Sequence, residues 1–114
     1  MSSEVNFILD QGATFTQTII YKDSEGNPVD LTNYTARSKA RESLESDTVV
    51  WNLTNGNGIT LGGPTGEITI TVAASTTATY EAGSTFVYDL ELVNGSIVTR
   101  LIQGVITVSG EVTR

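Results

Sequence analysis

The chain has 114 residues, with 13 acidic and 6 basic side chains and neither cysteine nor histidine. The net charge of −7 argues against non-specific binding to nucleic acid or to anionic membranes, since both require a basic surface. Without cysteine there is no disulfide framework or cysteine metal site, and without histidine the commonest general base is missing. No stretch reaches the roughly 18 apolar residues of a membrane-spanning helix.

The length predicts one domain, residues 1–114, with a core of modest depth. Residues 1–4 lack the basic and apolar regions of a signal peptide, so we expect a complete protein made in the cytoplasm. Short apolar or alternating segments predict strands at 5–9, 13–21, 34–41, 48–53, 59–61 and 67–73. Clusters of glycine, asparagine, aspartate and proline separate them and predict turns. Ser75 is expected to cap a single helical turn that ends at Tyr80.

Residues 85–107 form the strongest pattern, a β-hairpin. Apolar residues alternate from Phe86 to Leu92, and Asn94-Gly95 follows, a pair typical of a type I′ turn. This turn predicts four facing pairs: Val93 with Ser96, Leu92 with Ile97, Asp89 with Arg100 and Tyr88 with Leu101. Gly104 is expected to mark a bulge, because the apolar phase shifts after Leu101 to Ile102, Ile106 and Val108. The Asp89–Arg100 pair should lie on the outer face.

Many short strands joined by tight turns predict an all-β fold, an immunoglobulin-like antiparallel β-sandwich of roughly seven to nine strands. The order of strand, short helical turn, glycine and aromatic strand in residues 67–86 resembles the corner of such sandwiches. The predicted inner faces comprise Phe15, Ile19, Tyr34, Trp51, Ile68, Ile70, Val72, Phe86, Tyr88, Leu90, Leu92, Ile97 and Leu101.

The segment 34–41 is unusual because Arg37, Lys39 and Arg41 alternate on one of its faces and make up half of the basic residues. One hypothesis is a partner interface that comprises this basic stripe and the acidic residues Glu42, Glu45 and Asp47 of the loop that follows. The alternative is a solvated face, with the cations paired to those acids or to acids on a neighbouring strand.

No catalytic, cofactor-binding or metal-ligating residue is assigned. Residues 23–30 space their oxygen atoms loosely like a calcium loop, but a plain turn explains them better because the twelfth-position glutamate is missing. Asp89 and Glu91 share one face, yet Arg100 should keep Asp89 ionised, which does not suit a general acid. Serine and threonine have no histidine to activate them.

Two stretches resemble known proteins. Lys22-Asp-Ser-Glu-Gly-Asn-Pro-Val-Asp-Leu-Thr-Asn-Tyr-Thr-Ala-Arg37 is similar to a phrase in small structural proteins of tailed bacteriophages and in the N-terminal domain of upper baseplate proteins. Residues 98–114 resemble the closing strand of such stand-alone phage proteins, with Gly110 where proline is commoner. The resemblance implies a β-sandwich that attaches or stabilises tail, baseplate or fibre components in the virion. Its partners would be other virion proteins and further copies of itself, without nucleic acid, membrane or small molecules.

Two other functions stay open. The first is a capsid decoration (cement) protein, bound where capsomers meet. The second is a carbohydrate-binding module, disfavoured because only Trp51 and four tyrosines could stack on sugars and most should lie in the core. A short N-terminal strand and the tail 111–114 could also pair with a neighbouring protein by strand addition.

Overall fold

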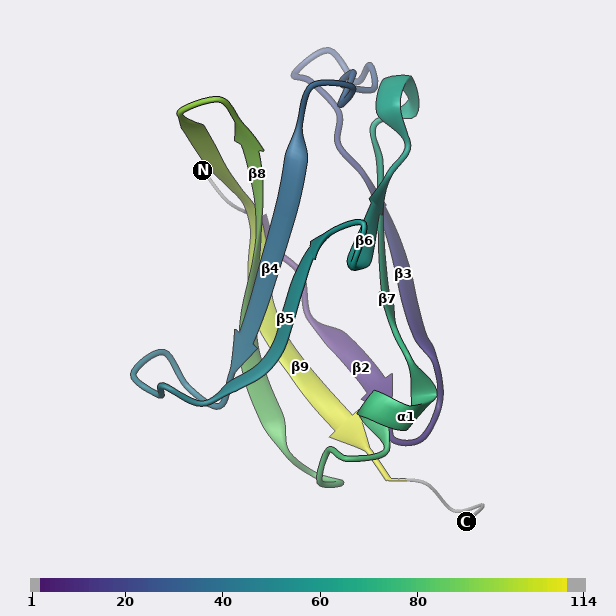
Figure 1. Cartoon of the computed structure of the whole chain (residues 1–114), viewed down its shortest axis with the longest axis vertical. Coiled ribbons are helices and arrows are strands. Elements are labelled where there is room, and N and C mark those ends of the chain that lie inside the picture. Colours follow the sequence, from purple (N-terminus) through teal and green to yellow (C-terminus); the bar gives the residue numbers. More distant parts are fainter. Residues whose placement is uncertain (1–2, 111–114) are drawn as a thin grey trace.

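The structure is a computed structural model that describes residues 3–110 and consists mainly of β-strands (Figure 1). The strands within these residues are β1 (Ser3–Glu4), β2 (Phe7–Asp10), β3 (Phe15–Ile20), β4 (Thr35–Arg41), β5 (Val49–Asn55), β6 (Gly58–Leu61), β7 (Glu67–Val72), β8 (Thr85–Asn94) and β9 (Ile97–Ser109). The helical pieces of the same residues are a 3-10 turn, η1 (Gly63–Thr65), and a one-turn helix, α1 (Ala74–Thr77). The predicted all-β class is confirmed.

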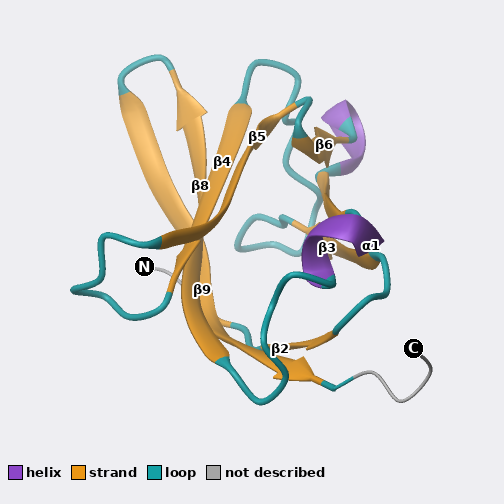
Figure 2. Ribbon diagram, turned by 60° about the horizontal axis from the view of Figure 1, so that its bottom comes forward, coloured by secondary structure: helices purple, strands orange, loops and turns teal. Residues whose placement is uncertain are grey.

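All nine strands of residues 3–110 belong to one curled sheet, ordered β1-β9-β8-β4-β5-β6-β7-β3, with β2 also paired to β9. Neighbours are antiparallel except where β1 and β2 meet β9 and where β5 meets β6. Figure 2 shows β4, β8 and β9 as one wall, with β3, β6 and α1 across from it. The hydrogen bonding defines a single sheet, so the immunoglobulin-like sandwich stays a prediction. No helix in residues 3–110 is long and apolar enough to cross a membrane.

The curl buries one face of the sheet around a chain of touching aromatic rings. Phe7, Phe15, Trp51 and Tyr88 contact one another with ring centroids 5.3 to 6.2 Å apart. Nine predicted core residues are buried: Phe15, Trp51, Ile68, Ile70, Val72, Phe86, Tyr88, Leu90 and Leu92. Ile19, Tyr34 and Leu101 are partly buried against this core. The prediction is wrong for Ile97, whose side chain is 67% exposed.

The hairpin β8–β9 exists, but its predicted register is wrong. Gly95 and Ser96 form the turn, with Asn94 opposite Ile97, and only Gly95 has a positive φ, of 62°. Glycine at the first central position is typical of a type II′ turn rather than the expected type I′. The facing pairs are therefore Val93 with Val98, Leu92 with Thr99, Glu91 with Arg100 and Tyr88 with Gly104.

The predicted bulge also lies elsewhere on β9. Glu91 faces Arg100 while Leu90 faces Ile102, which leaves Leu101 as the extra residue. The shift turns Ile102, Ile106 and Val108 into the core, where each is at most 4% exposed. Burial of each such side chain stabilises the fold by about 1.5–3 kcal/mol, which outweighs leaving Ile97 in water.

The short helix α1 is not capped as predicted. Ala73 is the N-cap residue and no side chain bonds the helix start, so the capping role expected of Ser75 is wrong. The buried side chain of the helix is Thr77 instead, whose hydroxyl donates to the carbonyl of Ala13 at 2.8 Å and accepts from the N–H of Gly12 at 3.1 Å. Thr77 thereby ties α1 to the turn that precedes β3.

Candidate functional site on the outer face of β4

The predicted alternation along β4 is confirmed. Ala36, Ser38 and Ala40 are buried, whereas Arg37 and Lys39 are exposed on the opposite face. Strand pairing sets the surroundings of the basic stripe Arg37, Lys39 and Arg41. On β8 its three residues face Glu91, Asp89 and Val87 respectively, while Asn52 and Thr54 of β5 lie opposite Lys39 and Arg37. Because β9 is the next strand, Arg100 joins the same outer face.

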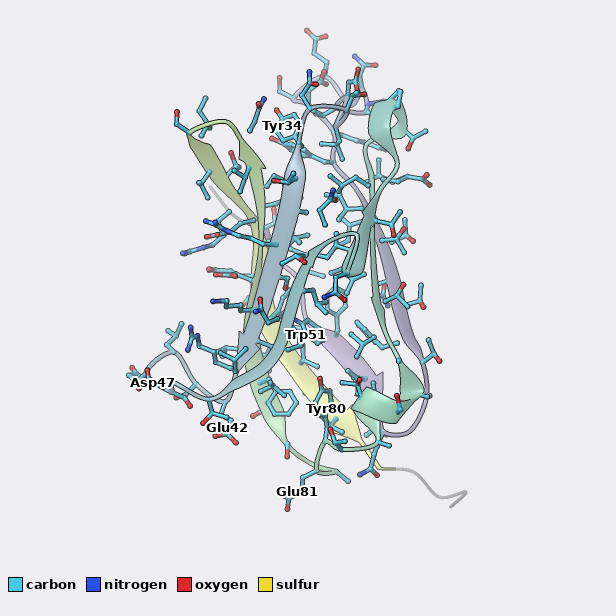
Figure 3. All side chains as sticks on the ribbon, in the orientation of Figure 1. Tyr34, Glu42, Asp47, Trp51, Tyr80 and Glu81 are labelled. Carbon is cyan, nitrogen blue, oxygen red and sulfur yellow. The ribbon has the colours of Figure 1, made fainter. Side chains whose placement is uncertain are left out.

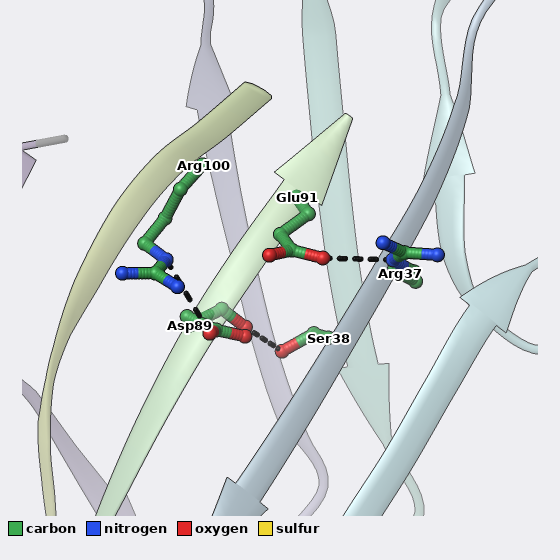
Figure 4. Close-up of polar contacts among 5 residues, drawn as sticks. All are labelled: Arg37, Ser38, Asp89, Glu91 and Arg100. Atoms are coloured by element: carbon green, nitrogen blue, oxygen red, sulfur yellow. Dashed lines mark hydrogen bonds and ion pairs between the residues drawn. The ribbon is translucent and has the colours of Figure 1, made fainter. Parts of the chain in front are cut away.

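Two ion pairs join these strands (Figure 4). The Nε atom of Arg37 lies 2.8 Å from Oε1 of Glu91, and the Nε atom of Arg100 lies 3.6 Å from Oδ2 of Asp89. The predicted Asp89–Arg100 pair therefore forms, although across a diagonal of the ladder rather than between facing residues. Among the described residues Lys39 has no ion-pair partner within 4.0 Å. Exposed pairs of this kind contribute roughly 0–1 kcal/mol each, so they do little for stability.

A buried serine anchors this face to the core. The hydroxyl of Ser38 donates to the carbonyl of Asp89 at 2.6 Å (Figure 4) and accepts from the indole N–H of Trp51 at 3.1 Å. Trp51 points between the two halves of the sheet and is only 4% exposed (Figure 3). Tyr80 and Tyr88 are buried as well. These three rings are too deeply buried for a sugar to stack on them, whereas Tyr21 and Tyr34 are partly buried. The carbohydrate-binding module stays a disfavoured alternative.

The outer face holds a groove of about 440 Å³. The sequence predicts the basic stripe that lines it but not the groove itself. Its lining adds Arg100, Leu44 and Gln103 to the basic stripe. The sequence pattern predicts Arg100 only as a partner of Asp89, since nothing in it indicates that β4 lies beside the hairpin. The strand order places β4 next to β8 and β8 next to β9. It thereby brings four of the five basic side chains of residues 3–110 to one groove.

The acidic loop, residues 42–48, borders this groove. Glu42, Glu45 and Asp47 are all exposed, and the loop projects from the body of the sheet between β4 and β5 (Figures 1 and 3). Its Leu44 is 85% exposed. The guanidinium of Arg41 donates to the carbonyl of Ser46 at 3.0 Å, which holds the loop beside the basic stripe. Of the six residues of the predicted interface, Arg37, Lys39 and Arg41 line the groove, whereas Glu42, Glu45 and Asp47 are exposed on the adjoining loop. The use of this surface as an interface stays a hypothesis.

Arg100 lowers the pKa of the Asp89 carboxyl, in the expected direction, but burial and Glu91 have larger effects on this group. Partial burial raises the pKa of the Asp89 carboxyl above its ordinary value of 3.8, and the nearby charge of Glu91 raises it further. The cations Arg100, Arg37 and Arg41 lower it by less than these two effects raise it. Because the folded chain binds this proton more tightly than the unfolded chain, the contribution of Asp89 to stability falls as pH rises through the window above 3.8.

We expect Asp89 to titrate at a higher pH than Asp30 in the folded chain. Hydrogen bonds from the hydroxyl and N–H of Thr32 lower the pKa of Asp30, whereas burial and Glu91 raise that of Asp89. NMR of the side-chain carboxyl carbons measures both midpoints. Glu91→Gln should lower the midpoint of Asp89 and leave Asp30 unchanged; an Asp89 midpoint below that of Asp30 would contradict this electrostatic description.

In the calcium-like turn, residues 23–30, backbone N–H groups of the turn itself bind the carboxylate of Asp23. Oδ1 of Asp23 accepts hydrogen bonds from the N–H groups of Glu25 and Asn27, at 2.9 and 3.0 Å. Such bonds stabilise a turn, in agreement with the simpler interpretation. Within residues 3–110 no group of three or more acidic side chains is arranged to hold a metal ion.

Comparison of the chain with protein-family models finds no match. Comparison with curated protein sequences finds none either.

Proposed function

We propose that the chain is a non-enzymatic structural module of a tailed-bacteriophage virion, which attaches or stabilises tail, baseplate or fibre components through protein contacts. The resemblance of residues 22–37 and 98–114 to phage structural proteins supports this role. In this proposal the two halves of the curled sheet act as the layers of an immunoglobulin-like sandwich.

The observation that carries the proposal is the composition of the outer face of β5, β4, β8 and β9. This face gathers Arg37, Lys39, Arg41 and Arg100 in a chain of net charge −7. Exposed apolar residues flank the charges, with Val98 at 47% and Val105 at 36%. Arginine beside exposed apolar area is typical of protein–protein interfaces. The proposed contact residues are Arg37, Lys39, Arg41, Glu42, Glu45 and Asp47.

The test is to locate the protein on intact virions. Purified particles are decorated with antibodies against the folded chain and imaged by electron microscopy, with an antibody against a host protein as control. We expect label on the tail, baseplate or fibres. Label on the capsid surface would overturn the tail assignment in favour of a decoration protein. Virions that carry no label would contradict a virion role altogether.

A further inference from the structure

We propose that two copies of this chain associate face to face about a two-fold axis, with the acidic loop of each seated in the basic groove of the other. The inference rests on the proposed function only in that both use the outer face of β4 for protein contacts. It concerns the purified chain, so its test is independent of where the protein sits in a virion.

The groove is a local reversal of charge. Four cations line it, and the carboxylates of Asp89 and Glu91 neutralise only two of them. Lys39 has no ionic partner within residues 3–110, and the Nε atom of Arg100 is 3.6 Å from its carboxylate, too long for a hydrogen bond. The groove therefore keeps a net positive charge of two in a chain that is otherwise strongly acidic. A carboxylate-bearing surface is the complement of such a groove.

The acidic loop provides a negatively charged surface that complements the groove. Glu42, Glu45 and Asp47 give it three negative charges, and none of the three forms an ion pair with a described residue. Leu44 stands between them with 85% of its surface exposed. One exposed leucine is ordinary on a protein surface, but here it lies at the rim of a groove that also contains Val87. Val87 offers the leucine of a second copy an apolar contact.

The position of the two halves selects the symmetry. Leu44 and Arg41 both line the groove, so the acidic and basic patches lie side by side on one face of the molecule. A face divided in this way becomes self-complementary when a two-fold axis runs in the interface along the border between the patches. Each loop then meets the partner's groove once, so the same contact forms twice in the dimer, which is the isologous arrangement of most homodimers.

Charge reversal on each half tests the inference by sedimentation velocity of the purified chain over a range of micromolar concentrations. In the groove variant, Arg37→Glu, Lys39→Glu and Arg41→Glu make both patches acidic. In the loop variant, Glu42→Lys, Glu45→Lys and Asp47→Lys make both patches basic. We expect wild type to dimerise, each variant alone to stay monomeric, and an equimolar mixture of the two to form heterodimers, because opposite patches face each other again.

Two controls separate the pairing from general charge effects. Asp10→Lys, Glu25→Lys and Glu81→Lys change the net charge as much as the loop variant does, at exposed sites that do not line the groove, and should leave the dimer intact. Lys39→Glu alone breaks no ion pair of the fold, and should weaken dimerisation by about tenfold or more. Circular dichroism checks that every variant is folded.

The remaining outcomes overturn the inference. A wild-type chain that is monomeric throughout the concentration range excludes the dimer. A loop variant that still self-associates shows that the groove binds another acidic surface. A mixture that does not associate excludes the two-fold pairing, and none of these results bears on labelling of the virion.

Discussion

Replacement of Leu90 by alanine is expected to lower the free energy of unfolding by about 2–5 kcal/mol, the range for removal of a buried leucine side chain. Leu90 has no exposed surface and lies in the middle of β8, between Ser38 of β4 and Ile102 of β9. Whole domains are stable by only about 5–15 kcal/mol, so this loss is a large part of the total. Urea unfolding followed by the fluorescence of the buried Trp51 measures it.

The matched control is Ile97→Ala, an aliphatic truncation in the same hairpin. Ile97 is 67% exposed, so its truncation should change the free energy of unfolding by no more than about 0.5 kcal/mol. The comparison also tests the register of β8 and β9, because the register expected from the turn residues would place both side chains in the core. Losses of similar size at the two positions would show that Ile97 is buried and that the observed register is wrong.

The hairpin shows which part of the fold could be predicted. The alternation of Phe86, Tyr88, Leu90 and Leu92 is a local signal, and all four are buried as expected. The turn is also local, but Asn94-Gly95 and Gly95-Ser96 both offer a glycine with a suitable φ. The choice between them depends on β9, where a bulge at Leu101 buries Ile102, Ile106 and Val108. Packing across the sheet therefore decided the register.

The candidate site likewise has a part that the sequence predicts and a part that only the strand order reveals. The basic stripe was predictable because period-2 alternation alone places Arg37, Lys39 and Arg41 on one face. Its neighbours were not, since the strand order brings β4 between β5 and β8, whose residues are distant in sequence. The ion pair of Arg37 with Glu91 and the inclusion of Arg100 in the groove both follow from that order. Of the proposed strand-addition segments, β1 and β2 already pair with β9, and residues 111–114 lie outside the described part of the chain.

Gly104 illustrates a residue whose role only the assembled sheet reveals. It was expected to form a bulge, yet it pairs regularly with Tyr88, and its φ is not positive. What requires glycine is the N-terminal segment that crosses beside it between β1 and β2. A Cβ atom at residue 104 would lie 2.2 Å from the carbonyl oxygen of Val5 and 2.8 Å from Oδ1 of Asn6. A strand glycine at such a close backbone approach leaves no room for any side chain.

We therefore expect Gly104→Ala to lower the free energy of unfolding by about 1–3 kcal/mol, the usual cost of an added methyl group in a filled space. The effect should be strongest locally, because residues 5 and 6 must move away from β9. Their displacement would break the 2.9 Å bonds from the N–H of Val5 to the carbonyl of Gln103 and from the N–H of Val105 to Asn6. It would also remove the acceptor of the Tyr88 hydroxyl, the carbonyl of Val5 at 2.6 Å.

Amide hydrogen exchange gives the decisive measurement, because it separates local opening at β1 and β2 from global unfolding. In Gly104→Ala the amides of Val5 and Val105 should exchange faster by more than the loss of global stability explains, while Leu90 follows global stability alone. Gly110→Ala is the control: its new Cβ would lie 3.3 Å from Cβ of Ala82 on an exposed turn, and it should change stability by no more than about 0.5 kcal/mol. If Gly104→Ala and Gly110→Ala change stability and amide exchange by the same amount, the N-terminal crossing does not depend on glycine at position 104.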